Sequence, residues 1–278
     1  MNRTAARRTA LAASLLVALA GPARAQSAEN PMLILTVTGG WITGGEMWRV
    51  SRQPALVAPA GVDTVGLERR LQTGAVVGVD ATLFRSPHIG YSVGLTFLGV
   101  STESRCAPPA QWAVDPNYVN EHACSDVQGR NLGTSAVAIQ FGLTWRPIAT
   151  GGIQPYLKGV AGPAYLGESF VETSGTVPLP NDSGQITYPV KTLLGDPNPR
   201  TLTWVATLSA GVTLAMSPGA QFRFEAREVL TDLPVATGPG NPLTQGTPAP
   251  IGSRIFHLPS FTVGLDIVLE QARRPHRY

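Results

Sequence analysis

Apolar and polar residues alternate along eight segments of this 278-residue chain. The pattern is clearest in 89–100, where large apolar residues occupy every odd position from Ile89 to Phe97 and small or polar residues lie between them. Such alternation predicts strands with one apolar face and one small, polar face. The other segments with this period are 32–42, 72–84, 134–146, 153–166, 201–216, 221–230 and 256–269.

The connections between these segments alternate in length. Turns of about four to six residues follow the second, fourth and sixth segments, whereas roughly 25–35 residues follow the first, third, fifth and seventh. A membrane barrel with up-and-down topology has short turns at one end and long loops at the other. The chain is therefore predicted to be all-β, an eight-stranded antiparallel up-and-down transmembrane β-barrel with short periplasmic turns and four long extracellular loops.

The first 25 residues have the features of a cleaved signal peptide. Arg3, Arg7 and Arg8 precede an apolar run at 11–20, and Ala23-Arg24-Ala25 provides a cleavage site. A run of about ten apolar residues is too short to span a bilayer, which needs about 20. The expected organisation is a signal peptide at 1–25, the barrel at 26–269 and a short basic periplasmic tail at 270–278.

Removal of the signal peptide changes the charge of the chain. Its four arginines account for the formal net charge of +3, which becomes −1 in the mature protein. The charge balance therefore gives no reason to expect nucleic-acid binding. The mature sequence also lacks an apolar run long enough for a membrane helix.

Seven charged residues fall on the small, polar faces of the predicted strands. They are Asp80, Arg146, Lys158, Arg223, Glu225, Arg227 and Asp266. Lipid requires apolar side chains on the outside of a barrel, so these charges are expected to form a neutralising network in the lumen. The alternative is a carboxylate site of Asp80, Glu225 and Asp266, against which the neighbouring arginines argue.

Aromatic residues near the strand ends are expected to form girdles at the membrane surfaces. They are Trp41, Trp48, Tyr91, Trp145, Tyr165 and Trp204. Three prolines conflict with the strand pattern, because a closed barrel has no edge for a residue without an N–H group. We expect strand five to start after Pro155, Pro163 to lie at a bulge or the outer rim, and Pro259 to precede the membrane-embedded part of strand eight.

Cys106 and Cys124 are the only cysteines and lie in the connection after the third strand. In an oxidising compartment they are expected to form a disulfide, worth about 3 kcal/mol in the chain-entropy model. Metal binding by both cysteines and His122 is the alternative, but a fourth ligand is missing. Trp112 and Tyr118 lie in the same connection, which is either a binding surface or a solvated loop.

The sequence offers little for catalysis. His257 and Ser260 come nearest to a base and a nucleophile, but three residues apart on a strand they point to opposite faces. No Gly-rich phosphate loop follows a strand and leads into a helix. The chain is expected not to be an enzyme and to hold no cofactor or metal.

Together these features resemble the small bacterial outer-membrane barrel proteins of the OmpA, OmpX and OmpW type. The resemblance covers about 32–269 and is architectural, so it transfers no functional residue. It implies outer-membrane lipid and the outer-membrane assembly machinery as partners. Such proteins usually end on a strand with a terminal aromatic; Tyr278 is aromatic, but 271–277 do not have the sequence of a strand.

The leading interpretation is an integral outer-membrane protein with a structural or surface-interaction role, whose long loops meet an extracellular ligand or protein. The second is a narrow pore or conduit for small or apolar molecules. An eight-stranded lumen is just filled by side chains, but inward small residues such as Gly94 and Gly211 leave some space. Two further alternatives are a lipid-modifying enzyme and a soluble periplasmic ligand-binding barrel, the latter with its apolar faces inward.

Overall fold

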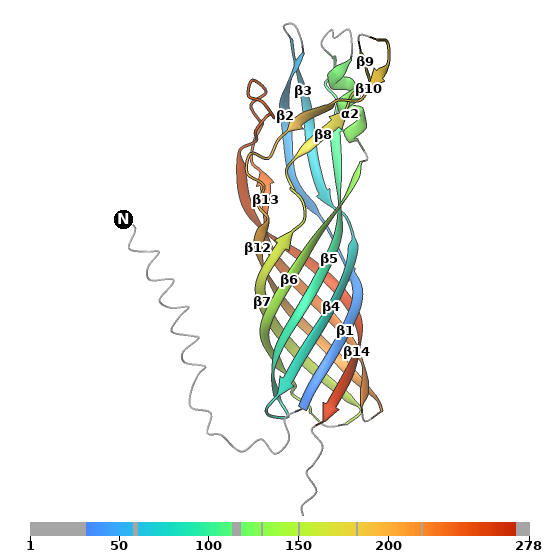
Figure 1. The fold of residues 1–278 in the computed structure, drawn as a ribbon. Helices are drawn as coiled ribbons and strands as arrows, with labels where there is room; N and C mark the ends of the chain where they lie inside the picture. Colours follow the sequence, from blue (N-terminus) through green and yellow to red (C-terminus); the bar gives the residue numbers. More distant parts are fainter. Residues whose placement is uncertain are drawn as a thin grey trace, which may run out of the picture.

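The computed structural model describes residues 32–57, 61–112, 118–128, 130–149, 151–181, 183–217 and 219–270. The predicted signal peptide, and all but the first residue of the predicted tail, lie outside these ranges. The barrel strands are β1 (Met32–Ile42), β4 (Gly74–Phe84), β5 (Ile89–Ala107), β6 (Asn131–Trp145), β7 (Ile153–Leu166), β12 (Leu202–Ser217), β13 (Ala220–Ala236) and β14 (Ile251–Glu270). They pair antiparallel in this order, and β14 returns to β1, so the ring is closed (Figure 1). The predicted eight-stranded all-β barrel is confirmed.

Side chains of the ring strands alternate between the outside and the lumen. In β1, Ile34, Thr36 and Thr38 are buried, whereas Leu35 and Val37 are exposed. The same alternation leaves a band of large apolar residues exposed around the ring; it includes Val79, Leu95, Ile139, Leu157, Leu208, Phe222 and Leu265. A closed ring satisfies its backbone hydrogen bonds internally, and an apolar outer band is what lipid requires. None of the described helices has the length and apolar character needed to cross a membrane.

Toward the extracellular end of β5 the outer face changes from apolar to charged, and the inner face becomes partly apolar. In β5 the inward residues are small or polar as far as Thr96 and then include the apolar Leu98 and Val100 as well as the polar Thr102 and Ser104, while the outward residues are apolar as far as Phe97 and charged at Glu103 and Arg105. The alternation itself continues unbroken, so the change reflects the surroundings rather than the strand. Below this level lipid surrounds the barrel, and above it water does.

The connections at the extracellular end form an ordered domain above the ring (Figure 1). Its elements are β2 (Glu46–Val57), β3 (Gly61–Leu71), α2 (Val119–Val127), β8 (Thr173–Thr176), β9 (Leu179–Pro180), β10 (Ile186–Thr187) and β11 (Val190–Leu194). β3 pairs with the upper part of β5, so the β2–β3 hairpin continues the barrel wall above β1 and β4. The first predicted long loop is thus largely a hairpin, and the sequence pattern missed it because two register shifts in β2 interrupt the period of two.

This domain has an apolar core, in contrast to the polar lumen below it. Met47, Val65, Leu67, Phe170 and Leu194 are among its buried residues, each at most 2% exposed. Trp48 also belongs here: it is 4% exposed, and its Nε1 donates a hydrogen bond to the carbonyl of Phe170 at 3.0 Å. Its prediction as a girdle residue was therefore wrong. The other five predicted girdle aromatics are exposed on the outer surface.

Pro155 and Pro163 are both inside β7, which begins at Ile153. The expectation that strand five starts after Pro155 was therefore wrong. β6 ends opposite Leu157, so the β6 side of Pro155 has no paired strand and no ladder hydrogen bond is lost there.

Pro163 lies near the extracellular end of β7. It pairs with Trp204 without a register shift, so the expected bulge is not present. On the side that faces β6, the β6–β7 pairing is interrupted between Ala164 and Ala161. The proline therefore lies where these two strands are not paired.

Candidate functional site

Two groups of ion pairs fill the lumen within the membrane band. Lys158 Nζ lies 2.7 Å from Asp80 Oδ1, and both side chains are less than 10% exposed. Arg223 binds Asp266 with two hydrogen bonds, Nε to Oδ1 at 2.9 Å and Nη2 to Oδ2 at 3.0 Å. Thr36 donates a further hydrogen bond to Asp266 at 2.8 Å. Charge-assisted, bidentate hydrogen bonds of this kind fix both partners in position.

Glu225 connects the second group. Its carboxylate accepts from Arg227 Nε at 3.0 Å and from the Tyr156 hydroxyl at 2.7 Å, and it lies 3.8 Å from Arg223. Arg227 also donates to Thr38 Oγ1 at 3.4 Å. The arrangement is a network of ion pairs rather than a cluster of free carboxylates, because Asp80, Glu225 and Asp266 each face a cation.

Arg146 lies apart from these pairs. Its guanidinium stacks over the Phe84 ring at 3.9 Å, and Nη1 donates to Gln154 at 3.3 Å. No carboxylate among the described residues forms an ion pair with it, although it is 2% exposed. The structure therefore brings six of the seven predicted lumenal charges into contact and holds the seventh against an aromatic ring.

The small inward residues provide room for this network. A Cβ atom at Gly94 would collide with the Asp80 carboxylate, and one at Gly211 would collide with the Tyr156 phenol ring. The space that these glycines leave is thus occupied by the charged and phenolic side chains. This removes the main sequence feature that favoured an open lumen.

An apolar layer closes the barrel above the ion pairs. Ile42, Val76, Leu98, Val205 and Leu258 come from five different strands and are each at most 5% exposed. They belong to the same core as the extracellular domain. Two layers of buried side chains therefore occupy the lumen, charged ones in the membrane band and aliphatic ones above them.

A disulfide attaches the helix of the extracellular domain to the barrel wall. Cys106 at the end of β5 bonds to Cys124 in α2, with the Cα atoms 5.3 Å apart. Both sulfurs are used, so neither can act as the thiolate ligand of a metal. Asn120 fastens the same helix to the β2–β3 hairpin, because its Nδ2 lies 2.9 Å from Asp63 Oδ2 and 3.3 Å from the carbonyl of Ala55.

Arg69 of β3 is a second anchor that the sequence pattern did not reveal. It is 1% exposed, stacks near the Trp48 ring at 5.8 Å, and donates to the carbonyl of Glu172 at 2.5 Å and to Thr173 Oγ1 at 3.2 Å. Burial lowers the pKa of Arg69 to about 10, and the nearby Glu172 and Glu168 act in the opposite direction. The guanidinium therefore stays charged at neutral pH and holds the segment between β7 and β8 against the hairpin.

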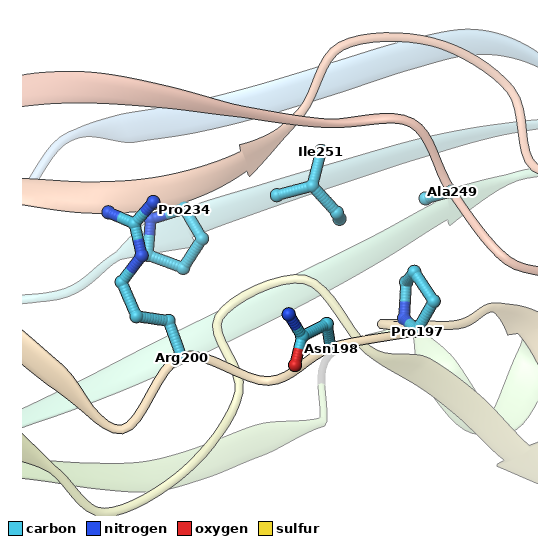
Figure 2. Close-up of a pocket in the computed structure, with 6 residues that line it drawn as sticks. All are labelled: Pro197, Asn198, Arg200, Pro234, Ala249 and Ile251. Carbon is cyan, nitrogen blue, oxygen red and sulfur yellow. The ribbon is translucent and has the colours of Figure 1, made fainter.

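A surface cleft of about 410 Å³ lies in this extracellular domain (Figure 2). Its lining residues are Pro197, Asn198, Arg200, Pro234, Ala249 and Ile251. Figure 2 shows the first three on the segment before β12 and the others on the β13–β14 side. Arg200 Nη1 donates to Asp232 at 2.9 Å and to Ser253 at 3.4 Å, so one polar corner adjoins an apolar wall. Three segments distant in the sequence form the cleft, which explains why the sequence did not indicate it.

His257 and Ser260 do not meet. The His257 side chain is exposed and its Nδ1 lies 3.1 Å from Glu228 Oε1, whereas Ser260 is 7% exposed and faces inward. Among the described residues no group of three or more His, Cys, Asp or Glu side chains is placed to hold a metal ion.

No protein-family model matches the chain, and no curated protein does. Among solved structures, it is similar to the outer membrane protein OprG from Pseudomonas aeruginosa, with a TM-score of 0.48 and 7% identity over 86% of this chain and 95% of that one. Its similarity to Neisserial surface protein A has a TM-score of 0.39, with 8% identity over 85% of this chain and 96% of that one. Its similarity to the outer membrane protease OmpT from Escherichia coli has a TM-score of 0.34, with 10% identity over 87% of this chain and 98% of that one.

The features of the chain itself decide its class. It has a closed antiparallel ring, an exposed apolar band and a polar lumen, which together are the requirements of a β-barrel in lipid. The chain is a membrane-spanning β-barrel of the outer-membrane type. Its apolar faces point outward in the band, which is the opposite of what the soluble ligand-binding alternative requires.

Proposed function

We propose that this chain is a non-conducting outer-membrane protein that presents a binding surface to the exterior. The observation that carries the proposal is the filled lumen, in which Arg223, Glu225 and Asp266 are each at most 1% exposed. A solute crossing the barrel would have to separate buried ion pairs, and uncompensated buried charges are costly. The interior of an eight-stranded barrel leaves no other route once its side chains are packed.

The extracellular domain supports the binding role. Its elements are held by the Cys106–Cys124 disulfide, by Asn120 and by Arg69, so the surface that they present is fixed before a ligand arrives. Preorganisation of this kind lowers the entropy lost on binding. The cleft beside Arg200 combines an apolar wall with a polar corner, so it offers a small ligand both kinds of contact.

A lipid-modifying activity has weaker support. Catalysis by a nucleophile and a base needs the two groups within hydrogen-bond reach. His257 pairs with Glu228 on the outer surface, while Ser260 faces the lumen. We therefore propose a role in binding rather than in catalysis.

Planar-bilayer recording tests the proposal. The purified, folded protein is expected to give no unitary conductance steps above the bare-bilayer baseline, because the ion pairs and the apolar layer both block the lumen. The matched sample is the Asp80→Ala/Lys158→Ala double variant, which removes both partners of one ion pair, so that neither is left charged without the other, and keeps the apolar layer. It is expected to give no conductance steps either. Reproducible steps with the unaltered protein would overturn the non-conducting role in favour of the narrow pore.

A further inference from the structure

The upper part of β14 has a strand neighbour on one side only. It pairs with β13 from Ile251 to Ile267, whereas its pairing with β1 begins at Ser260. β1 ends at Ile42, and the last contact on this side is a pair of hydrogen bonds from Thr43 to the carbonyl of Pro259. Within the described residues, the segment 251–258 therefore forms an open edge of the extracellular sheet.

The hydrogen bonds at the two ends of this segment show which backbone groups face the open side. The carbonyl of Pro259 accepts from Thr43 on the β1 side, and the carbonyl of Pro250 accepts from Thr237 on the β13 side. Backbone groups of successive residues in a strand point to opposite sides. The N–H and C=O groups of Ile251, Ser253, Ile255 and His257 are therefore directed to the open edge.

This edge is accessible, and neither a bulge nor a proline interrupts it. Ser253, Arg254, Ile255 and His257 are exposed, and the pairing of β14 with β13 continues here without a register shift. Edge strands are usually blunted by bulges, prolines or charged side chains. β2 has two register shifts and Pro54, whereas 251–258 has neither a bulge nor a proline and carries one arginine, Arg254.

We propose that the edge 251–258 of β14 binds an extended acidic peptide segment of another molecule by strand addition. The unpaired backbone groups would supply main-chain hydrogen bonds, and the exposed Ile251 and Ile255 would pack against alternate aliphatic side chains of the peptide. This inference rests on the proposed surface-binding function and names its partner class.

The charge at the edge selects an acidic segment. Arg254 stacks over the Phe256 ring at 5.3 Å, and no carboxylate among the described residues forms an ion pair with it. A carboxylate on the added strand would supply that partner at a cross-strand position.

A second copy of this chain in the same membrane cannot add to the edge as an antiparallel strand. Two copies in one membrane share an orientation, so a two-fold axis normal to the bilayer leaves both β14 strands running toward the periplasm. They therefore cannot form an antiparallel pair, whereas a peptide that is free of the membrane can approach in either direction.

The test uses a fluorescent synthetic peptide as long as the open edge, in which valine alternates with threonine around a central aspartate. Binding to the folded protein in detergent is followed by anisotropy, with hydrogen exchange at the amides of Ser253, Ile255 and His257 as a second readout. Ile255→Pro removes a donor from the open side only and is expected to weaken binding about tenfold. Ile255→Val keeps that donor and is the matched control.

Arg254→Glu provides an independent variant that leaves the backbone intact. It is expected to reverse the preference, so that a peptide with lysine in place of the aspartate binds better than the original. Equal binding by Ile255→Pro and Ile255→Val, or unchanged exchange at the three amides, would overturn the strand-addition site. If the protein does not bind the peptide at this edge and gives no conductance steps in the bilayer, the strand-addition site alone is ruled out. Conductance steps would instead count against the proposed function.

Discussion

Replacement of Asp266 by alanine is expected to lower the free energy of unfolding by about 3–5 kcal/mol. Asp266 is fully buried and accepts both hydrogen bonds of the Arg223 guanidinium. Without it, Arg223 keeps its charge inside the membrane band with only Glu225 nearby, 3.8 Å away. Urea unfolding of the protein in lipid vesicles, followed by tryptophan fluorescence, measures the change.

Two further variants separate this effect from general damage to the barrel. Glu228→Ala removes one partner of the exposed pair with His257 and is expected to change stability by less than about 1 kcal/mol. Arg223→Met/Asp266→Leu removes both buried charges together and is expected to recover most of the loss. An Asp266→Ala protein as stable as Glu228→Ala would show that the lumenal ion pairs do not hold the barrel together.

An arginine on the lipid-facing side of β5 should also have a large effect. Leu95→Arg places a charge in the middle of the apolar band and is expected to cost about 2–4 kcal/mol. Ser101→Arg is the matched control, because residue 101 is on the same face of the same strand but above the level where polarity reverses. The measured quantity is the fraction of protein that reaches the outer membrane in folded form.

Leu208→Arg repeats the experiment on β12, across the barrel. Normal membrane yields of both Leu95→Arg and Leu208→Arg would contradict the assignment of the lipid face. A loss with Ser101→Arg equal to that with Leu95→Arg would move the membrane boundary upward.

The eight ring strands were predictable because lipid imposes a strict period of two on a closed barrel. Every outward position from Ile89 to Phe97 must be apolar, and every inward one must fit the lumen. The inward charges were recognisable for the same reason, since a charge on the lumenal face needs a partner there. Lys158 and Asp80 lie 78 positions apart in the sequence, but the strand phase alone placed both inside.

The extracellular domain was less predictable because water, rather than lipid, surrounds it. Its hairpin β2–β3 carries mostly polar residues outward and mostly apolar residues inward, and its bulges break the period of two. Trp48 and Arg69 became buried there through contacts with the segment between β7 and β8, which no local pattern encodes. The cleft beside Arg200 arises from three distant segments, so it too depends on the complete fold.

The partners of the chain stay predictions. Contact with outer-membrane lipid follows from the apolar band, and insertion by the outer-membrane assembly machinery follows from the resemblance to small barrel proteins. The extracellular ligand or protein expected at the long connections now has two defined surfaces to occupy, the cleft and the open edge of β14.

Gel mobility in SDS shows whether this chain closes into a barrel inside a membrane. The outer-membrane fraction is run with and without heating. A closed ring keeps its backbone hydrogen bonds away from the detergent, so the unheated protein is expected to migrate as a compact band that shifts on heating. A protein found in the soluble fraction, with the same mobility before and after heating, would rule out a closed barrel in the membrane.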